Sequence, residues 1–131
     1  MRLPVRRAME VCPVEVAVSV LGGTWKLTLV KHLGAGPRRF GELCRLVPLA
    51  NRKTLTRQLR ELEEDGVVGR TVHPQVPPKV VYALTDLGHS LAPVVAAMDA
   101  WGEHFERTAT GRAATSVSQT SVAETPAREP A

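Results

Sequence analysis

Glycine and proline residues interrupt the middle of this chain at short intervals, and this spacing limits the elements that the chain can form. The interruptions are Gly22-Gly23, the stretch Gly-Ala-Gly-Pro at 34–37, Pro48 and Gly66. Glycine is a residue at which helices commonly end, and proline cannot continue a helix. Each segment between two interruptions is therefore expected to be one short element.

The spacing of apolar residues predicts a helix in each of the four segments before residue 66. Alternating valines at 14, 16, 18 and 20 would also suit a strand in the first segment, but the proline at its start and the glycines at its end favour a helix. Thr24 and Asn51 are suitable N-caps for the second and the fourth helix. The helices are expected at 12–21, 25–33, 41–47 and 52–65, with a short extended piece at 38–40.

The sequence after Gly66 predicts a β-hairpin and one long helix. Two strands are expected at 67–73 and 80–84, separated by a turn whose three prolines make it too rigid to belong to either strand. Thr85 is expected to cap the helix. The helix carries a broad apolar stripe at Leu87, Leu91, Val94, Val95, Met98, Trp101 and Phe105.

The order of these elements predicts the fold. The third and fourth helices form a helix-turn-helix and the hairpin forms its wing, which gives a mainly helical α+β fold of the winged helix-turn-helix class with a C-terminal helix. A chain of 131 residues suits one such domain, expected at 12–107. Residues 1–11 are expected to be a flexible N-terminal arm, and the small and polar residues of 108–131 to be a disordered tail.

The predicted helix at 52–65 has one apolar side and one basic side. At 100° per residue its leucines lie on one side, and Lys53, Arg57 and Arg60 lie on the other. The formal net charge of +4 would by itself fit many proteins. Seven cations between residues 38 and 60 against one acid place positive charge where double-stranded DNA would bind. A solvated helix with internal ion pairs is the alternative interpretation, and the wing favours DNA binding.

Candidate DNA contacts follow from this placement. Thr56 and Arg57 are expected to be the central contacts, because polar and forked cationic side chains in the first turns of a recognition helix reach base edges and phosphates. Each wing residue could equally be an ordinary surface residue. The candidates are Arg39, Asn51, Arg52, Lys53, Thr54, Thr56, Arg57 and Arg60 in the helix-turn-helix, and His73, Gln75 and Lys79 in the wing.

Several motifs occur in an order that resembles the HxlR family of bacterial winged-helix regulators, in the MarR-like superfamily. The resemblance spans about residues 12–105. The motifs are Cys12-Pro13-Val14, Leu21-Gly22-Gly23-Thr24-Trp25-Lys26, Gly36-Pro37-Arg38-Arg39-Phe40, Leu55-Thr56, Leu59-Arg60-Glu61-Leu62, Asp65-Gly66-Val67-Val68, Tyr82-Ala83-Leu84-Thr85 and Trp101-Gly102. Ala50 departs from the family pattern, which has a larger aliphatic residue before the recognition-helix cap.

The resemblance implies a transcriptional regulator that is a homodimer, with the C-terminal helix as a dimerisation helix, and that binds an inverted-repeat operator. Repression is the mode of regulation that it implies. Part of the apolar stripe, notably Leu87 and Leu91, is instead expected to cover the domain's own core. The expected interface residues are Val14, Val18, Val95, Met98, Trp101 and Phe105.

The two cysteines are expected to remain free thiols in a reducing compartment. Cys12 and Cys44 are far apart and form no CxxC pair, which argues against a disulfide scaffold or a zinc knuckle. The resemblance implies a thiol-sensor role for Cys12, at a helix N-terminus that favours thiolate. The alternative for Cys12 is a small buried residue at the helix entry, and Cys44 is expected in the core.

No pattern in the sequence indicates catalysis, a cofactor or a metal. The four histidines are scattered, and neither a glycine-rich phosphate loop nor a nucleophile motif is present. With no signal peptide or membrane-spanning stretch, a cytoplasmic protein is expected. A winged helix that binds another protein is the main rival function. A small-molecule effector stays open, because a pocket between the dimer helices and the wing domain could bind one although the chain has no separate effector domain.

Overall fold

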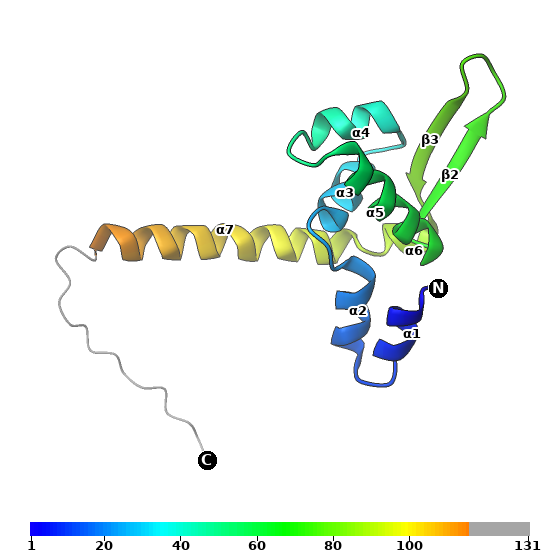
Figure 1. Ribbon diagram of the computed structural model, residues 1–131. Helices are drawn as coiled ribbons and strands as arrows, with labels where there is room; N and C mark the ends of the chain where they lie inside the picture. The colour runs from blue at the N-terminus through cyan, green and yellow to red at the C-terminus, as the bar shows by residue number, and fades with distance from the viewer. Residues whose placement is uncertain (116–131) are drawn as a thin grey trace. The chain divides into compact units, whose positions relative to one another are not determined.

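The computed structural model describes residues 1–115, and the chain divides into two units, Met1–Val95 and a second unit that begins at Ala96. The first unit contains the helix-turn-helix and the hairpin (Figure 1). The elements are α1 (Leu3–Ala8), α2 (Pro13–Leu21), α3 (Lys26–Leu33), β1 (Arg38–Arg39), α4 (Phe40–Leu46), α5 (Arg52–Glu64), β2 (Val68–His73), β3 (Lys79–Leu84), α6 (Asp86–His89) and α7 (Ala92–Thr115).

The helices α2, α3, α4 and α5 confirm the four predicted helices, with ends that shift by at most one residue. Pro13 is the first residue of α2, where its missing N–H costs no hydrogen bond. Asn51 caps α5 as expected, since its side-chain oxygen accepts a hydrogen bond from the Thr54 N–H at 2.8 Å. The helix α3 begins one residue later than predicted, with Trp25 in place of Thr24 at its N-cap.

The sheet has three antiparallel strands in the order β1-β3-β2. Strands β2 and β3 form the predicted hairpin, with Val68 opposite Leu84 and His73 opposite Lys79. The two-residue strand β1 pairs with β3 through Arg38 and Arg39, so it fastens the start of α4 to the wing. The architecture is the predicted winged helix-turn-helix.

The core lies between α3, α4, α5 and the start of β2. Leu55, Leu59 and Leu62 of α5 are at most 1% exposed, and they pack with buried residues of α3 and α4 and with Val67 and Val68. Burial of such leucines stabilises the fold by roughly 1.5–3 kcal/mol each. The opposite side of α5 therefore faces solvent.

The first eleven residues are not the flexible arm that the sequence predicted. Residues 3–8 form α1, whose Val5 and Ala8 are buried. The Arg2 guanidinium binds the Asp65 carboxylate at 2.7 and 2.8 Å and donates to the Ser19 carbonyl at 2.8 Å. The prediction was wrong because these partners are distant in the sequence.

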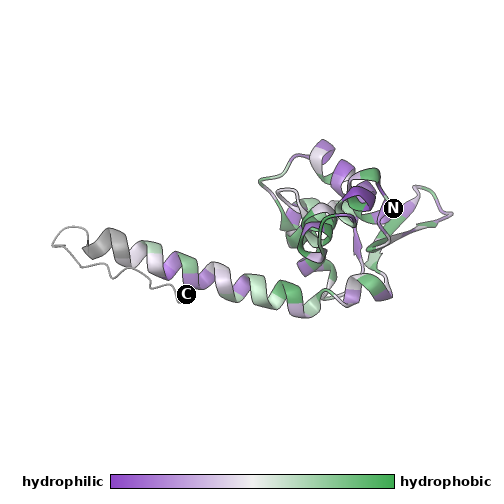
Figure 2. Cartoon of the chain, turned by 90° about the horizontal axis from the view of Figure 1, so that it is seen from below, coloured by the Kyte–Doolittle hydropathy of each residue, from purple (hydrophilic) through white to green (hydrophobic). Residues whose placement is uncertain are grey.

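The predicted long helix after Thr85 is divided into α6 and α7. Thr85 caps α6, as predicted, by accepting a hydrogen bond from the Gly88 N–H at 3.1 Å. Pro93 explains the division, because it has no N–H for the carbonyl of His89 and its ring would clash there. Hydrophobic and hydrophilic residues alternate along α7 (Figure 2).

Helix α7 also continues into the segment that was predicted to be disordered. It extends to Thr115, so residues 108–115 are helical. Residues 116–131 of the predicted tail lie outside the described residues. No helix of the part that the structure describes is long and apolar enough to cross a membrane.

Candidate nucleic-acid interface

Helix α5 presents a basic, polar face to solvent. Lys53, Arg57 and Arg60 are exposed, and the buried leucines occupy the opposite side. Asn51 and Arg52 at the start of the helix are exposed as well. The predicted division of this helix into a packing side and a basic side is thus what the structure contains.

A buried amide holds α5 against the rest of the domain. Gln58 is 4% exposed, and its side-chain oxygen accepts a hydrogen bond from the Trp25 N–H at 3.1 Å. This N–H belongs to the N-cap of α3, where the helix itself offers no partner. Gln58 was not singled out by sequence reasoning, because a polar residue in a charged helix gives no sign of burial.

The two threonines of the predicted site differ in what limits their contact with DNA. The Thr56 hydroxyl donates to the Arg52 carbonyl at 2.8 Å, so it keeps only its lone pairs for another partner. Thr54 is partly buried. Of the two predicted central contacts, Arg57 is therefore the one that is able to donate hydrogen bonds freely.

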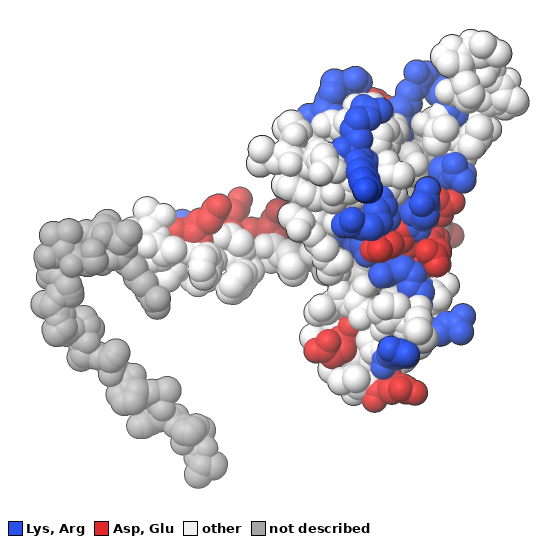
Figure 3. Space-filling view, in the orientation of Figure 1, with Lys and Arg blue, Asp and Glu red and all other residues white. Residues whose placement is uncertain are grey.

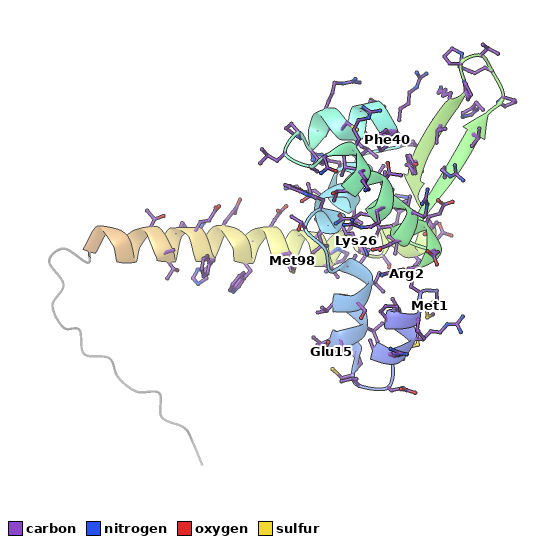
Figure 4. The ribbon with its side chains drawn as sticks, viewed as in Figure 1. Met1, Arg2, Glu15, Lys26, Phe40 and Met98 are labelled. Carbon is purple, nitrogen blue, oxygen red and sulfur yellow. The ribbon has the colours of Figure 1, made fainter. Side chains whose placement is uncertain are left out.

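Arg39 and Arg52 lie at the starts of the two helices of the helix-turn-helix. The backbone N–H of Arg39 donates to the Glu42 carboxylate at 2.8 Å, and Arg39 is exposed. The Arg52 guanidinium lies over the ring of Phe40, 5.0 Å from its centre, within range of a cation–π interaction. Phe40, labelled in Figure 4, is a positioning residue that the sequence analysis did not identify.

The wing places its three predicted residues near its tip. His73 and Lys79 are opposite each other in the last pair of the hairpin. The Gln75 N–H donates to the His73 carbonyl at 2.9 Å, and the Gln75 side chain is exposed in the turn.

A cavity of about 320 Å³ separates the wing from the starts of α4 and α5. It brings together four of the predicted residues, Arg39, Arg52, Gln75 and Lys79. His73 does not line it, and neither do Lys53, Arg57 and Arg60 on the remainder of α5.

The acidic residues at the end of α5 have cationic partners outside the basic face. Glu61 forms an ion pair with Lys26 at 2.7 Å, and a hydrogen bond from Lys26 lowers the pKa of the Glu61 carboxyl. Glu63 pairs with Arg70 at 3.5 Å. Among residues 1–115, no ion pair within 4.0 Å joins Arg57 or Arg60 to these acids. The intrahelical ion pairs of the alternative interpretation are therefore absent from residues 1–115, although the charge of Arg57 also contributes to lowering the pKa of Glu61. Figure 3 shows cations over α4, α5 and the wing.

Cys12 is exposed at the N-cap of α2, in the turn between α1 and α2. This position contradicts the alternative in which Cys12 is a small buried residue. Cys44 is partly buried and packs against the core, as expected. Within residues 1–115, His, Cys, Asp and Glu side chains form no group of three or more that could hold a metal ion.

Most of the predicted dimer residues are exposed apolar side chains in the single chain. Val14 and Val18 on α2 are more than half exposed. In the second unit Met98, Trp101 and Phe105 are also more than half exposed, and the two aromatic rings lie 5.5 Å apart. Val95 differs, because it is partly buried against the core of its own chain.

Sequence comparison relates this chain to known regulators. A family model described as HxlR-like helix-turn-helix matches residues 20–110. The HTH-type transcriptional regulator YdeP of Bacillus subtilis is 50% identical over 97 residues, which are 74% of this chain and 76% of YdeP. The HTH-type transcriptional regulator YodB of the same organism is 40% identical over 95 residues, 72% of this chain and 85% of YodB.

Solved structures share the same fold. The redox regulator HypR in its oxidised form matches with a TM-score of 0.68 and 50% identity, over 71% of this chain and 96% of HypR. The reduced form of the transcriptional regulator YodB from B. subtilis matches with a TM-score of 0.63 and 40% identity, over 72% of this chain and 94% of YodB. The chain therefore belongs to the HxlR-like helix-turn-helix family of transcriptional regulators.

Proposed function

We propose that this transcriptional regulator is a homodimeric, cytoplasmic repressor that binds an inverted-repeat operator, with one α5 of the dimer in each of two successive major grooves. The observation that carries the proposal is the exposed basic face of α5, opposite leucines that are at most 1% exposed. A helix held in this way can enter the major groove without unpacking the domain. The wing beside it reaches the neighbouring backbone or minor groove.

Arg57 is the residue that we propose as the principal reader of bases. It lies in the second turn of α5, is exposed, and has no carboxylate partner within 4.0 Å in the described chain. An arginine in this position can donate two hydrogen bonds to a guanine edge. Lys53 and Arg60, on the same face, are assigned to phosphates.

The dimer is proposed to form through the exposed apolar residues of α2 and α7. Val14, Val18, Met98, Trp101 and Phe105 are all more than half exposed in the single chain. Exposed aromatic residues that form a contiguous patch are typical of protein interfaces. Two copies related by twofold symmetry would match an inverted-repeat operator.

The experiment that tests DNA recognition compares the wild type with Arg57→Ala on the DNA upstream of the protein's own gene. Wild type is expected to bind this duplex more tightly than a scrambled duplex. Arg57→Ala is expected to lose roughly 1–3 kcal/mol in each half-site, about 5- to 150-fold in affinity for each. Arg6→Ala is the matched control, because Arg6 is an exposed arginine of α1. Equal binding of both duplexes by wild type would instead favour the rival function of a protein-interaction module.

Cys12 is proposed to sense electrophiles such as quinones. Its thiol is exposed at a helix entry, and relatives of known structure include the redox regulator HypR and a quinone-bound form of YodB. In the proposed step the thiolate sulfur bonds to a ring carbon of the quinone. The quinone becomes a hydroquinone thioether, and its two oxygens end as hydroxyl groups after taking up the thiol proton and the displaced ring proton.

The sensing proposal is tested by treating DNA-bound protein with benzoquinone. Wild type and Cys44→Ser are expected to gain one quinone adduct by mass at Cys12 and to release the DNA, whereas Cys12→Ser keeps it. Cys44 is a suitable control because it is partly buried. If wild type forms the adduct and stays bound, the protein is a regulator without thiol sensing.

A further inference from the structure

Three cationic residues from three different elements line the cavity between the wing and the helix-turn-helix. Arg39 comes from β1, Arg52 from the first residue of α5, and Lys79 from the first residue of β3. The pairing of Arg39 with Val81 places β1 directly beside β3, two residues from Lys79. Three elements that are separate in the sequence therefore direct positive charge toward one small space.

No acidic residue lines this cavity; the nearby Glu42 carboxylate accepts from the backbone N–H of Arg39 at 2.8 Å. The remaining lining residues are Phe40, Gly41, Gln75, Pro77, Pro78 and Val80, none of which carries a charge. In the part of the chain that the structure describes, no ion pair within 4.0 Å involves Arg39, Arg52 or Lys79. Three like charges beside one cavity repel one another, and an anion between them relieves that repulsion.

Two parts of the cavity lining are restrained by their neighbours or by their own backbone. The Arg52 guanidinium lies 5.0 Å from the centre of the Phe40 ring, and Phe40 itself packs against the core. Prolines 77 and 78 form part of the wing side, and proline restricts the backbone. An anion that binds here meets one guanidinium, that of Arg52, that is already supported by a neighbour.

We propose that this cavity is a phosphate clamp, in which Arg39, Arg52 and Lys79 together hold a single phosphate of the DNA backbone. The proposal rests on the proposed function, since it names how that DNA is held. Gln75 donates an additional hydrogen bond from the wing. A contact to phosphate carries no sequence information, so the clamp fixes how the recognition helix and wing are placed on the duplex while residues such as Arg57 read the bases.

The salt dependence of DNA binding tests whether the three cations share one phosphate. Each neutralised phosphate contributes about 0.9 to the slope of log affinity against log salt concentration. A dimer on its operator has two clamps, one in each half-site. The variant Arg39→Gln/Arg52→Gln/Lys79→Gln is therefore expected to lose about 1.8 from that slope, where three separate phosphate contacts in each half-site would cost about 5.4. The double variant Arg6→Gln/Arg7→Gln, on the exposed face of α1, is expected to keep the wild-type slope.

A second measurement separates a backbone phosphate from a free phosphate ion. Duplexes of the upstream region with one uncharged methylphosphonate each are bound to wild type and to the triple variant. One position in each half-site is expected to weaken wild-type binding about tenfold and to leave the triple variant unaffected. Thermal unfolding by circular dichroism verifies that the triple variant is folded.

Each outcome has a definite meaning. A slope loss near two, with one sensitive phosphate per half-site, supports the clamp. An unchanged slope, a loss of about 3.6 or more, or the absence of a sensitive phosphate overturns the clamp and leaves the regulator function standing. If folded wild type binds no DNA at any salt concentration, the proposed function itself fails.

Discussion

Beneath the exposed face of α5, a lysine is buried almost completely. Lys26, labelled in Figure 4, has a side chain that is 2% exposed, and its Nζ atom lies 2.7 Å from the Glu61 carboxylate. Glu61 is 31% exposed and also lies 3.6 Å from Arg2. The two partners are therefore unequal, because water can solvate Glu61 when its partner is removed but cannot reach Lys26.

This inequality predicts that replacing Glu61 and replacing Lys26 lower the free energy of unfolding by different amounts. Glu61→Gln leaves a buried ammonium without its carboxylate and is expected to cost about 2–3 kcal/mol of unfolding free energy, whereas Lys26→Met is expected to cost about 1 kcal/mol. Urea unfolding of the two variants measures both values. Equal costs, or a larger cost for Lys26→Met, would show that the buried charge does not depend on Glu61.

The pair also predicts a pH dependence. The hydrogen bond from Lys26 holds the pKa of Glu61 below its ordinary value, so the folded state favours the carboxylate more than the unfolded state does. The resulting stability is present above the ordinary glutamate pKa of about 4.3 and is lost as the pH falls through the lowered pKa of the folded state. Urea unfolding of Glu61→Gln between about pH 5 and pH 3 is expected to show a smaller loss of stability than wild type.

At the scale of the elements, α1 is attached to the far end of the recognition helix. Arg2 binds Asp65, the C-cap of α5, through its backbone N–H at 2.9 Å and its guanidinium at 2.7 and 2.8 Å. The Asp65 side chain is only 1% exposed. The α1–α2 pair, with Cys12 in its turn, is thereby connected to the helix that is proposed to read DNA.

Removal of this attachment is expected to loosen α1. Arg2→Ala leaves the Asp65 carboxylate buried without its cation, at a cost of roughly 2–3 kcal/mol. Hydrogen exchange of the α1 amides is expected to accelerate more than exchange in the centre of α5, since Leu55, Leu59 and Leu62 still hold that helix. Arg6→Ala, on the same helix but exposed, is the control. Equal acceleration in both helices would contradict a local attachment.

At the scale of the whole molecule, the proposed dimer is what would make two recognition helices available to one operator. Trp101→Ala/Phe105→Ala is expected to raise the dimer dissociation constant at least 100-fold, because aromatic residues commonly dominate interface energy. Sedimentation equilibrium measures the constant. Leu49→Ala removes an apolar side chain that is 86% exposed in the first unit and is expected to leave the dimer intact. A dimer unaffected by the double variant would place the interface elsewhere.

Local patterns were sufficient to predict most elements and the basic face of α5. Leucines at helical spacing, with cations opposite them, indicate which side of the helix packs against the core. Helix caps and turns are indicated by the residue types at three positions, Asn51, Gly66 and Thr85. Gly66 takes a positive φ of 80°, a conformation that glycine adopts most readily. Pro93 could have predicted that the helix after Thr85 is interrupted. The continuous apolar stripe suggested a single helix instead.

Tertiary structure alone decided the features that depend on residues far apart in the chain. Helix α1 is held by Asp65, which is 63 residues from Arg2, and no local pattern contains that pairing. Nothing in the sequence distinguishes three of the cations, Arg39, Arg52 and Lys79, from the others. They line one cavity only because β1 pairs with β3 and Phe40 supports Arg52. The sequence by itself determined which residues carry charge and which face of a helix is apolar, since both follow from side-chain chemistry and helical period. Which charges meet is a consequence of how the packed elements bring distant segments together.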